Sequence, residues 1–414
     1  MAVSTLLVLA YVVATRPNPL TGDQSEWHTQ ALFFADGKLW WSDRPFGIAE
    51  ASTWRTPLYT AWVGIFYAVS DGTTTIVLAA QALLAAVTVA LSWALARRLF
   101  GPKPAIATAF VVATFPLVWE WFGLLYTEAL AIPLTMLALL LFLERPPTPR
   151  LAIALGAVMG VGMLVRPSAF FLFAGVVVAW VVVAGLRRSV AMTALAIGVA
   201  ALIVLPWTVR NYFVADGFVP ISMQDMAVYG TFNEVSANDP VYPYAWRAIP
   251  TPEVQEVLDG PPLTDAEFRS EMMDIGYDYV REHPLSVAEA FFWNGLSRFW
   301  DVRRPSRALD EVPFEGRSEA VTAVGLGIYY ALLPLALFAL WRHRRRLSLV
   351  LPVLAIALAA SIVFTTASGT RYRAPLEPLI AMLAVAAFVR PARSPAEDPR
   401  ERPQPAAVPA GTPG

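Results

Sequence analysis

The most regular feature of the chain is the recurrence of long apolar segments separated by short polar turns. These segments fall at residues 2–15, 74–96, 104–119, 128–143, 151–165, 168–186, 189–206, 319–341, 347–366 and 374–390. A run of about 20 apolar residues can cross the hydrocarbon core as a helix, which bonds its own backbone groups internally. The runs are continuous rather than alternating, which excludes a β-barrel. We therefore predict an all-α, polytopic integral membrane protein with about ten transmembrane helices, in a range of roughly nine to eleven.

Basic residues at the ends of the segments predict the orientation. Four clusters follow apolar segments: Arg97-Arg98 with Lys103, Arg145 with Arg150, Arg187-Arg188, and Arg342 to Arg346. Short loops rich in Lys and Arg stay cytoplasmic, and placing all four clusters inside leaves both termini inside. The external face then carries residues 16–73, 120–127, the Arg166-Pro167 turn, 207–318 and 367–373.

Two segments need a different interpretation. Residues 57–70 are apolar but short, and counting them as a span would put the loops of Asp23 and Glu128 on opposite faces. We interpret this segment as a re-entrant or surface helix. The first segment, 2–15, has no convincing cleavage site after it, so we interpret it as a signal-anchor rather than a cleaved signal peptide.

The pattern divides the chain into four parts. These are an N-terminal transmembrane module, 1–206, whose first external loop is 16–73; an external loop, 207–318; C-terminal transmembrane helices, 319–390; and a tail, 391–414. In the external loop, Thr264 to Glu267 and Ser286 to Glu289 each have the pattern of a capping box that opens an amphipathic helix, and the second helix looks interfacial. The Pro-, Ala- and Arg-rich tail is predicted to be disordered and cytoplasmic.

Composition agrees with a membrane protein and excludes other classes. The chain is 57% hydrophobic and only 15% charged, unlike a soluble domain of this length. Its net charge of −1 provides no basic surface for nucleic acid. The absence of Cys excludes disulfides and thiolate metal sites.

Acidic residues near the external face are candidates for chemistry. Asp23 could act as a general base on a hydroxyl, or it could be a solvated loop carboxylate or a helix N-cap. Glu26 and His28 are weaker candidates of the same kind. Glu128 begins an apolar segment, where the helix dipole alone is a sufficient reason for an acid. Glu120, between two Trp residues, is expected to be an interfacial loop residue.

Arginines on the external face run against the positive-inside bias. They are Arg55, Arg166, Arg210, Arg371 and Arg373. Guanidinium groups bind phosphate oxygens in a bidentate manner, so the set suggests an anionic ligand. The alternative is that they reach to lipid head groups, which explains one or two of them better than five. The many external Trp residues fit an aromatic belt, and one or two could stack on a sugar.

Seven short motifs occur in the order of a known family. They are Asp23, Trp27, Ala31 and Gly37; Arg55 to Tyr59; Arg98 to Gly101; Glu128; Gly156 to Pro167; Pro206 to Tyr212; and Arg371 to Pro378. With these motifs, from Gly22 to about Phe388, the chain resembles the polyprenyl-phosphate-sugar-dependent GT-C glycosyltransferases. That group includes the protein O-mannosyltransferases and the lipid A aminoarabinose transferase.

The resemblance implies roles for individual residues. Asp23 would be the catalytic acid/base and Glu128 the second site carboxylate. The donor phosphate would be held by Arg55, Arg166, Arg210, Arg371 and Arg373, and candidate substrate contacts are Glu26, Trp27, His28, Tyr59, Asn211 and Tyr372. Gln24 and Trp54 stand where relatives carry acids. We therefore predict no metal ligand and no certain cofactor, with a divalent metal ion left as an open alternative.

The expected function is a membrane glycosyltransferase active in cell-envelope glycosylation. The donor would be a hexose or pentose on a polyprenyl monophosphate, and the acceptor a hydroxyl of a lipid, polysaccharide or protein, with inversion at the anomeric carbon. The protein would be a multi-pass protein of the cell membrane with its active site on the extracytoplasmic face, in contact with membrane lipid and not with nucleic acid. A transporter or flippase for lipid-linked saccharides is the main alternative. A transporter would usually show paired structural repeats and would carry its ionisable groups at mid-membrane. A non-catalytic assembly subunit is a third reading.

Overall fold

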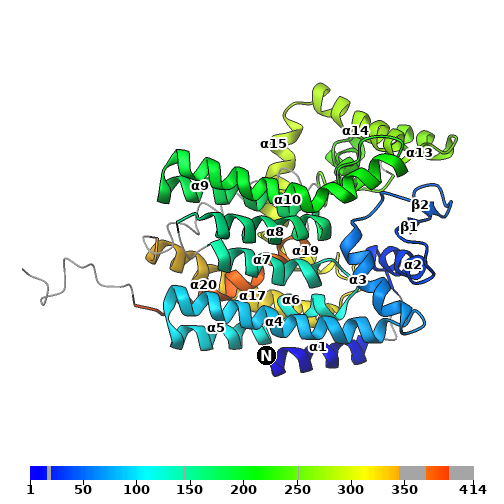
Figure 1. Cartoon of the computed structure of the whole chain (residues 1–414). Coiled ribbons are helices and arrows are strands. Elements are labelled where there is room, and N and C mark those ends of the chain that lie inside the picture. The colour runs from blue at the N-terminus through cyan, green and yellow to red at the C-terminus, as the bar shows by residue number, and fades with distance from the viewer. Residues whose placement is uncertain (16–19, 143–145, 250, 345–369, 391–414) are drawn as a thin grey trace, which may run out of the picture.

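The computed structural model of the chain describes residues 1–15, 20–142, 146–249, 251–344 and 370–390. Long helices lie side by side in one body, and shorter elements gather at one end of them and over one side (Figure 1). The predicted span 347–366 and the predicted disordered tail 391–414 lie outside the described residues.

The elements have the following bounds. The first half of the chain contains α1 (Ala2–Thr15), α2 (Asp23–Ala35), β1 (Trp41–Ser42), β2 (Glu50–Ala51), α3 (Pro57–Ala68), α4 (Thr74–Phe100), α5 (Pro102–Thr114), α6 (Pro116–Trp119), η1 (Glu120–Gly123), α7 (Glu128–Phe142), α8 (Pro149–Val165), η2 (Pro167–Phe170), α9 (Phe171–Ala184) and α10 (Leu186–Val214). The second half contains η3 (Met223–Ala227), α11 (Val228–Thr231), α12 (Glu234–Ala237), α13 (Pro252–Asp259), α14 (Asp265–Glu282), α15 (Ser286–Ala290), the π-helix η4 (Phe291–Arg298), α16 (Pro305–Leu309), α17 (Glu319–Arg342), α19 (Thr370–Arg373), η5 (Ala374–Leu376) and α20 (Glu377–Ala386).

The helical fold agrees with the all-α prediction, but the ten spans are supported only in part. Among the described residues, three helices are long and apolar enough to cross a membrane: α4, α10 and α17. A fourth span results if α5 and the following Pro116–Gly123 segment, bent by 67°, are counted together. Other predicted spans form apolar helices such as α1 and α8, with 14 and 17 residues. At about 1.5 Å per residue these fall short of the roughly 30 Å hydrocarbon core.

The helix that carries the predicted span 189–206 extends beyond it. The sequence predicts an external loop from residue 207, and α10 continues through Pro206 as far as Val214, so the first residues of this predicted loop are helical. Residues 219–221 pack against this extension and supply acceptors for it. Trp207 Nε1 donates to the carbonyl oxygen of Ile221 at 2.6 Å, and Asn211 Nδ2 donates to that of Val219 at 3.2 Å. Tertiary contacts therefore outweigh the helix-breaking tendency of the proline.

Close packing of α8 on α10 explains two glycines of the motif that leads to Arg166. A Cβ atom at Gly156 would lie 2.3 Å from the carbonyl oxygen of Ala196, and one at Gly160 would lie 3.0 Å from Cα of Ala200. Only glycine lets the two backbones approach this closely. The packing fixes the C-terminal end of α8, where Arg166 is the C-cap residue.

A group of short elements covers the end of the body that carries Asp23. The helices α2 and α3 pack on one another there, and β1 and β2 form a two-stranded antiparallel sheet beside them (Figure 1). A Cβ atom at Gly64 of α3 would lie 2.5 Å from the ring of Phe34 on α2, so the contact depends on glycine. With 12 residues, α3 is about 18 Å long and cannot cross the hydrocarbon core.

The region after α10 contains the predicted amphipathic helices. The capping box at Thr264 and Glu267 is confirmed at the start of α14. The second predicted capping box is wrong, because α15 begins after Leu285 without a side-chain cap. Asp265, the first residue of α14, accepts hydrogen bonds from Thr53 N at 2.5 Å and Thr53 Oγ1 at 2.7 Å. This contact ties α14 to the loop that carries Arg55.

Candidate active site

Asp23 is the first residue of α2, and both of its carboxylate oxygens are bound by arginines. Oδ1 accepts from Arg55 Nη2 at 2.8 Å, and Oδ2 accepts from Arg371 Nη1 at 2.6 Å. Gly22, at φ +55°, is the N-cap residue that precedes it. Asp23 is therefore neither an N-cap nor a free loop carboxylate, and its side chain belongs to an ionic site.

Glu128 belongs to the same site and is completely buried. Its Oε1 accepts from Arg166 Nη1 at 2.7 Å and from Arg371 Nε at 2.8 Å. Its Oε2 accepts from Thr127 Oγ1 at 3.2 Å. The helix dipole is thus not the reason this acid is retained at the start of α7, because two guanidinium groups contact it directly.

Arg371 joins the two carboxylates and is held by aromatic rings. Its guanidinium carbon lies 4.4 Å from the ring centroid of Tyr126 and 5.7 Å from that of Tyr372. The guanidinium carbon of Arg166 lies 4.4 Å from the same Tyr372 ring centroid. Tyr372 thus lies in contact with two of the predicted phosphate-binding arginines.

The third arginine of the site, Arg55, is shared with a further acid. Glu26 Oε2 accepts from Arg55 Nε at 3.0 Å and from Trp54 Nε1 at 3.0 Å. The guanidinium carbon of Arg55 lies 5.2 Å from the ring centroid of Trp27. Glu26 therefore orients Arg55 rather than standing free for catalysis, and Trp54 acts as its hydrogen-bond donor.

The acids and arginines of the site balance one another. Its charged residues are Asp23, Glu26, Glu128, Arg55, Arg166 and Arg371. Burial tends to raise the pKa of Asp23, but the charges of Arg55 and Arg371 and their hydrogen bonds outweigh burial and hold this pKa well below its usual range. In this arrangement Asp23 is ionised at neutral pH, with both oxygens occupied.

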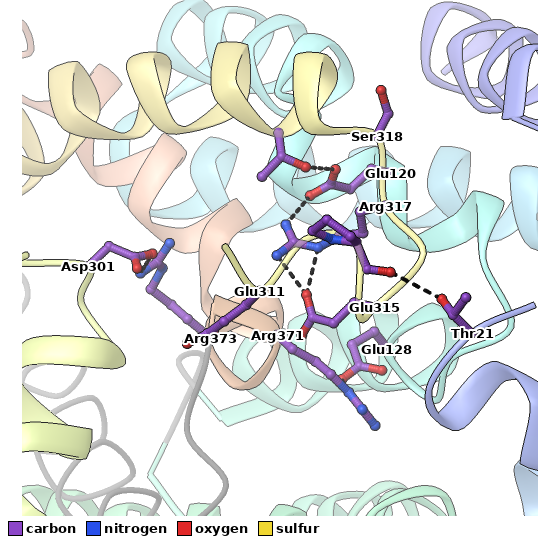
Figure 2. A network of polar contacts seen from close by, with 12 residues as sticks. Thr21, Glu120, Glu128, Asp301, Glu311, Glu315, Arg317, Ser318, Arg371 and Arg373 are labelled. Atoms are coloured by element: carbon purple, nitrogen blue, oxygen red, sulfur yellow. Dashed lines mark hydrogen bonds and ion pairs between the residues drawn. The ribbon is translucent and has the colours of Figure 1, made fainter. Parts of the chain in front are cut away.

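Two of the predicted phosphate-binding arginines lie elsewhere. Arg373 is fully buried and donates to Asp301 Oδ2 at 2.9 Å and to Glu377 Oε1 at 2.5 Å. In Figure 2 its side chain points toward Asp301, in a different direction from that of Arg371. Arg210 lies on the extension of α10 and donates to the carbonyl oxygen of Ser52 at 2.7 Å. Residues two positions apart on a helix such as α19 lie on nearly opposite faces, which separates Arg373 from Arg371.

The remaining predicted contacts are mostly structural. Tyr59 is buried and donates to Gln81 Oε1 at 2.9 Å, and Trp27 is also buried. His28 Nδ1 lies 2.7 Å from the hydroxyl of Tyr67. Asn211 binds backbone carbonyl groups, as described above. The structure therefore buries Trp27, Tyr59 and Asn211, whereas His28 is partly exposed.

Sequence reasoning missed a buried ionic network behind the site. Glu120, expected to be an interfacial loop residue, is fully buried and binds Arg317, which also binds Glu315 (Figure 2). The flanking residues Trp119 and Trp121 suggested that Glu120 lies at the membrane interface. No sequence pattern connects Glu120 to Arg317, so the ion pair between them could not be predicted. Tyr126 was missed as well, although it directly precedes the Thr127-Glu128 pair.

An apolar pocket extends from the arginines between the helices. Arg166 and Tyr372 contribute to its lining at the ionic site. Its other walls come from α7, α8, the α9 region and η5, with apolar side chains that include Leu134, Met159, Leu172 and Pro375. A cationic group beside an apolar channel suits a ligand with an anionic head and a hydrocarbon chain.

The donor set does not suit a divalent cation. Among the described residues, no group of three or more His, Asp or Glu side chains is placed to hold a metal ion. The carboxylates of Asp23, Glu26 and Glu128 are each engaged by guanidinium groups. We therefore derive no step through a metal ion.

Comparisons with known proteins agree with the sequence motifs. Residues 55–209, less than half of the chain, match the family model of the dolichyl-phosphate-mannose-protein mannosyltransferases. No curated protein matches the chain significantly. The fold is similar to that of the archaeal oligosaccharyltransferase AglB from Archaeoglobus fulgidus, solved with an inhibitory peptide and a dolichol-phosphate. That comparison has a TM-score of 0.51 and 14% identity over 93% of this chain and 49% of that chain.

A second solved structure with some similarity is ArnT from Cupriavidus metallidurans, bound to undecaprenyl phosphate. Its TM-score is 0.44, with 16% identity over 93% of this chain and 76% of that chain. The chain spans about half the length of the oligosaccharyltransferase it matches. The family-model match and the similarity of fold confirm the resemblance of this chain to the GT-C polyprenyl-phosphate-dependent glycosyltransferases.

Proposed function

We propose that this protein is a membrane glycosyltransferase that moves a sugar from a polyprenyl-monophosphate donor to a hydroxyl group. The observation that carries the proposal is the ionic site in which Arg371 contacts both Asp23 and Glu128, beside an apolar pocket that begins at Arg166. The acceptor hydroxyl would belong to a lipid, a polysaccharide or a protein, and the reaction would take place at the external face of the cytoplasmic membrane.

The donor would bind through its phosphate and its hydrocarbon chain. Arg166 and Arg371 both contact the ring of Tyr372 and the carboxylate of Glu128, and Arg166 and Tyr372 also line the apolar pocket. Their planar guanidinium groups match the geometry of phosphate oxygens. Glu128, which accepts hydrogen bonds from both arginines, would hold their guanidinium groups in position for the phosphate. The apolar pocket would take the first isoprene units of the donor. The dolichol-phosphate in the oligosaccharyltransferase complex is a ligand of this chemistry.

The reaction would be a single displacement at the anomeric carbon. The acceptor oxygen attacks that carbon from the face opposite the phosphate and passes its proton to Asp23. The bond between the anomeric carbon and the phosphate oxygen breaks, and the electron pair leaves with the lipid phosphate. Arg166 and Arg371 stabilise the charge that develops on this phosphate, which is worth most in a site shielded from water. Attack from the opposite face inverts the anomeric configuration.

Each oxygen of Asp23 accepts one guanidinium hydrogen bond in the structure, and these ion pairs lower its basicity. The donor phosphate would compete for Arg371 and Arg55 and so make Asp23 a stronger base towards the acceptor hydroxyl. This competition explains how a carboxyl group with a low pKa can serve as the base. The pKa of Asp23 would rise when one of its guanidinium partners binds the phosphate instead.

The test is sugar transfer from a panel of polyprenyl-phosphate hexoses and pentoses to membrane extracts. We expect the wild type to transfer one of them and Asp23→Asn to lose the transfer. A flippase for lipid-linked saccharides would instead move the donor across vesicle membranes without forming a product. Glu128 begins α7 and Arg166 caps the C-terminal end of α8, so these charged residues lie at helix ends rather than midway along the helices, which favours an enzyme. Translocation without transfer by the wild type would refute the proposal.

A further inference from the structure

The segment from Pro313 to Ser318, which we name the latch, lies against the loop that leads to Asp23. Thr21 Oγ1 donates to the carbonyl oxygen of Pro313 at 3.3 Å. At the other end of the latch, the N–H of Ser318 donates to the hydroxyl of Tyr11 at 3.1 Å. The latch connects α16 to α17, so it brings the end of the large external region to the first turn of α2.

Gln24 connects the latch with both acid-bearing segments. Its Nε2 donates to the carbonyl oxygen of Glu315 at 3.1 Å, and its Oε1 accepts from the N–H of Leu125 at 3.1 Å. The side chain is only 3% exposed, so neither bond is readily replaced by water. Gln24 follows Asp23 directly, and Leu125 stands three residues before Glu128. One amide therefore spans the two segments that supply the acids.

The latch itself is anchored by a buried ion-pair network. Arg317 Nη1 contacts Glu120 Oε1 at 3.0 Å, and Arg317 Nη2 contacts Glu315 Oε2 at 2.6 Å (Figure 2). Glu120 Oε2 also accepts from Thr322 Oγ1 at 3.1 Å. The side chains of Arg317 and Glu120 are fully buried, so breaking either pair would leave an unpaired charge. The support behind Gln24 is therefore rigid.

We propose that Gln24 is a positioning residue that sets the spacing between Asp23 and Glu128 by binding the latch and the Leu125 backbone together. This inference rests on the proposed function, because the spacing matters only if the two acids share one reaction centre. Arg371 reaches both carboxylates with different nitrogens of one rigid fork. A shift of about 1 Å between the two segments would break one of these bonds, and misplacements of that size reduce turnover by up to about 10²-fold.

Three variants test the hydrogen bonds of Gln24, one by removing both bonds and two by disturbing the bond to the latch. Gln24→Ala removes both, whereas Gln24→Glu keeps an acceptor for Leu125 and places a charged oxygen against the Glu315 carbonyl. Gly316→Ala acts from the side of the latch, because a Cβ atom there would lie 2.3 Å from Gln24 Nε2. The matched control is Gln30→Ala, which removes a second buried glutamine of α2 that binds Ser42 and Thr60 instead.

The experiment combines kinetics with a distance measurement. We expect Gln24→Ala, Gln24→Glu and Gly316→Ala to lower kcat by about 10- to 100-fold with donor KM within about twofold of wild type, and Gln30→Ala to lower it far less. Spin labels at Ser25→Cys and Phe314→Cys, both exposed positions in a chain without other Cys, report on the latch. Their distance distribution should be narrow in the otherwise wild-type chain and broad with Gln24→Ala.

Two results would overturn the proposal. One is wild-type kcat in the Gln24 variants, and the other is an equal loss in Gln30→Ala, which would indicate general loosening of α2. Higher activity of Gln24→Glu would also contradict it, because an acid at this position would then be catalytic. If the wild type transfers no sugar, the proposed function fails, whereas the spin-label distances still decide whether Gln24 holds the latch.

Discussion

Asp23 and Arg371 form an ion pair of 2.6 Å although they stand 348 positions apart in the chain. The same guanidinium group contacts Glu128 at 2.8 Å, so one cation links the start of α2 with the start of α7. Ion pairs of this kind lower the basicity of a carboxylate, and an anion that competes for the guanidinium groups would raise it again. The catalytic role of Asp23 and the phosphate-binding role of Arg371 can therefore be tested separately.

The first prediction concerns the base. Asp23→Asn keeps the shape of the side chain and removes its ability to accept a proton, so we expect turnover to fall by about 10²-fold or more. Expression and donor binding should change little. The measurement is the rate of transfer at saturating donor, with Asp36→Asn at the exposed C-terminal end of the same helix as a control. Glu26→Gln should have a smaller effect, since Glu26 orients Arg55. Near-normal transfer by Asp23→Asn would exclude the mechanism.

The sequence alone predicted that Asp23, Glu128 and Arg371 share one site, and the structure brings them together. Two kinds of signal led to this prediction. The basic clusters and the number of predicted spans between them assign all three residues to the same face, and the short motifs that contain these residues can be recognised from neighbouring positions in the sequence. It did not reach the partners of Arg373, Arg210 or Glu120, whose contacts join segments far apart in the chain. Gln24 was noted only as a departure from an acidic position, since its hydrogen bonds depend on the latch and on Leu125.

The second prediction concerns donor binding by Arg166. Lysine keeps the charge but not the fork, so Arg166→Lys should weaken donor use, and Arg166→Ala should weaken it further by roughly 1–3 kcal/mol. The measurement is the dependence of transfer on donor concentration. Arg150→Lys, at the exposed N-terminal end of α8, is the matched control and should leave donor use unchanged. A residue that only reaches lipid head groups would tolerate lysine, so equal donor affinity in the three forms at position 166 would remove the phosphate-binding role.

The third prediction separates Arg373 from Arg371. Arg373 is buried against Asp301 and Glu377, so Arg373→Ala should destabilise the fold by about 3–5 kcal/mol because it leaves the buried carboxylate of Glu377 unpaired, whereas Asp301 keeps its ion pair with Arg303. The donor KM of the protein that remains folded should be unchanged. Arg371→Lys should raise donor KM instead. Thermal unfolding in detergent, followed beside donor kinetics, checks both expectations. A raised donor KM in a stable Arg373→Lys variant would return Arg373 to the phosphate site.

The fourth prediction concerns the orientation of the site in the membrane. Thr73 and Lys103 are exposed residues just beyond the two ends of α4, a 27-residue helix that is long and apolar enough to span; Thr73 is its N-cap residue and Lys103 lies in the first turn of α5. Thr73 follows Gly72, where a Cβ atom would lie 2.7 Å from Leu32 of α2, so it reports the side on which the Asp23 loop lies. Position 72 itself is a poor site for a probe because its φ is +74°.

Single-Cys variants are informative because the natural chain contains no Cys. We expect a membrane-impermeant maleimide to label Thr73→Cys in intact cells and Lys103→Cys only after permeabilisation, since the basic end of α4 should stay cytoplasmic. Expression and transfer activity of both variants provide the control for correct folding. Labelling of Thr73→Cys only after permeabilisation would place Asp23 on the cytoplasmic side. The ionic site would then face the cytoplasm, and an acceptor outside the cell would be excluded.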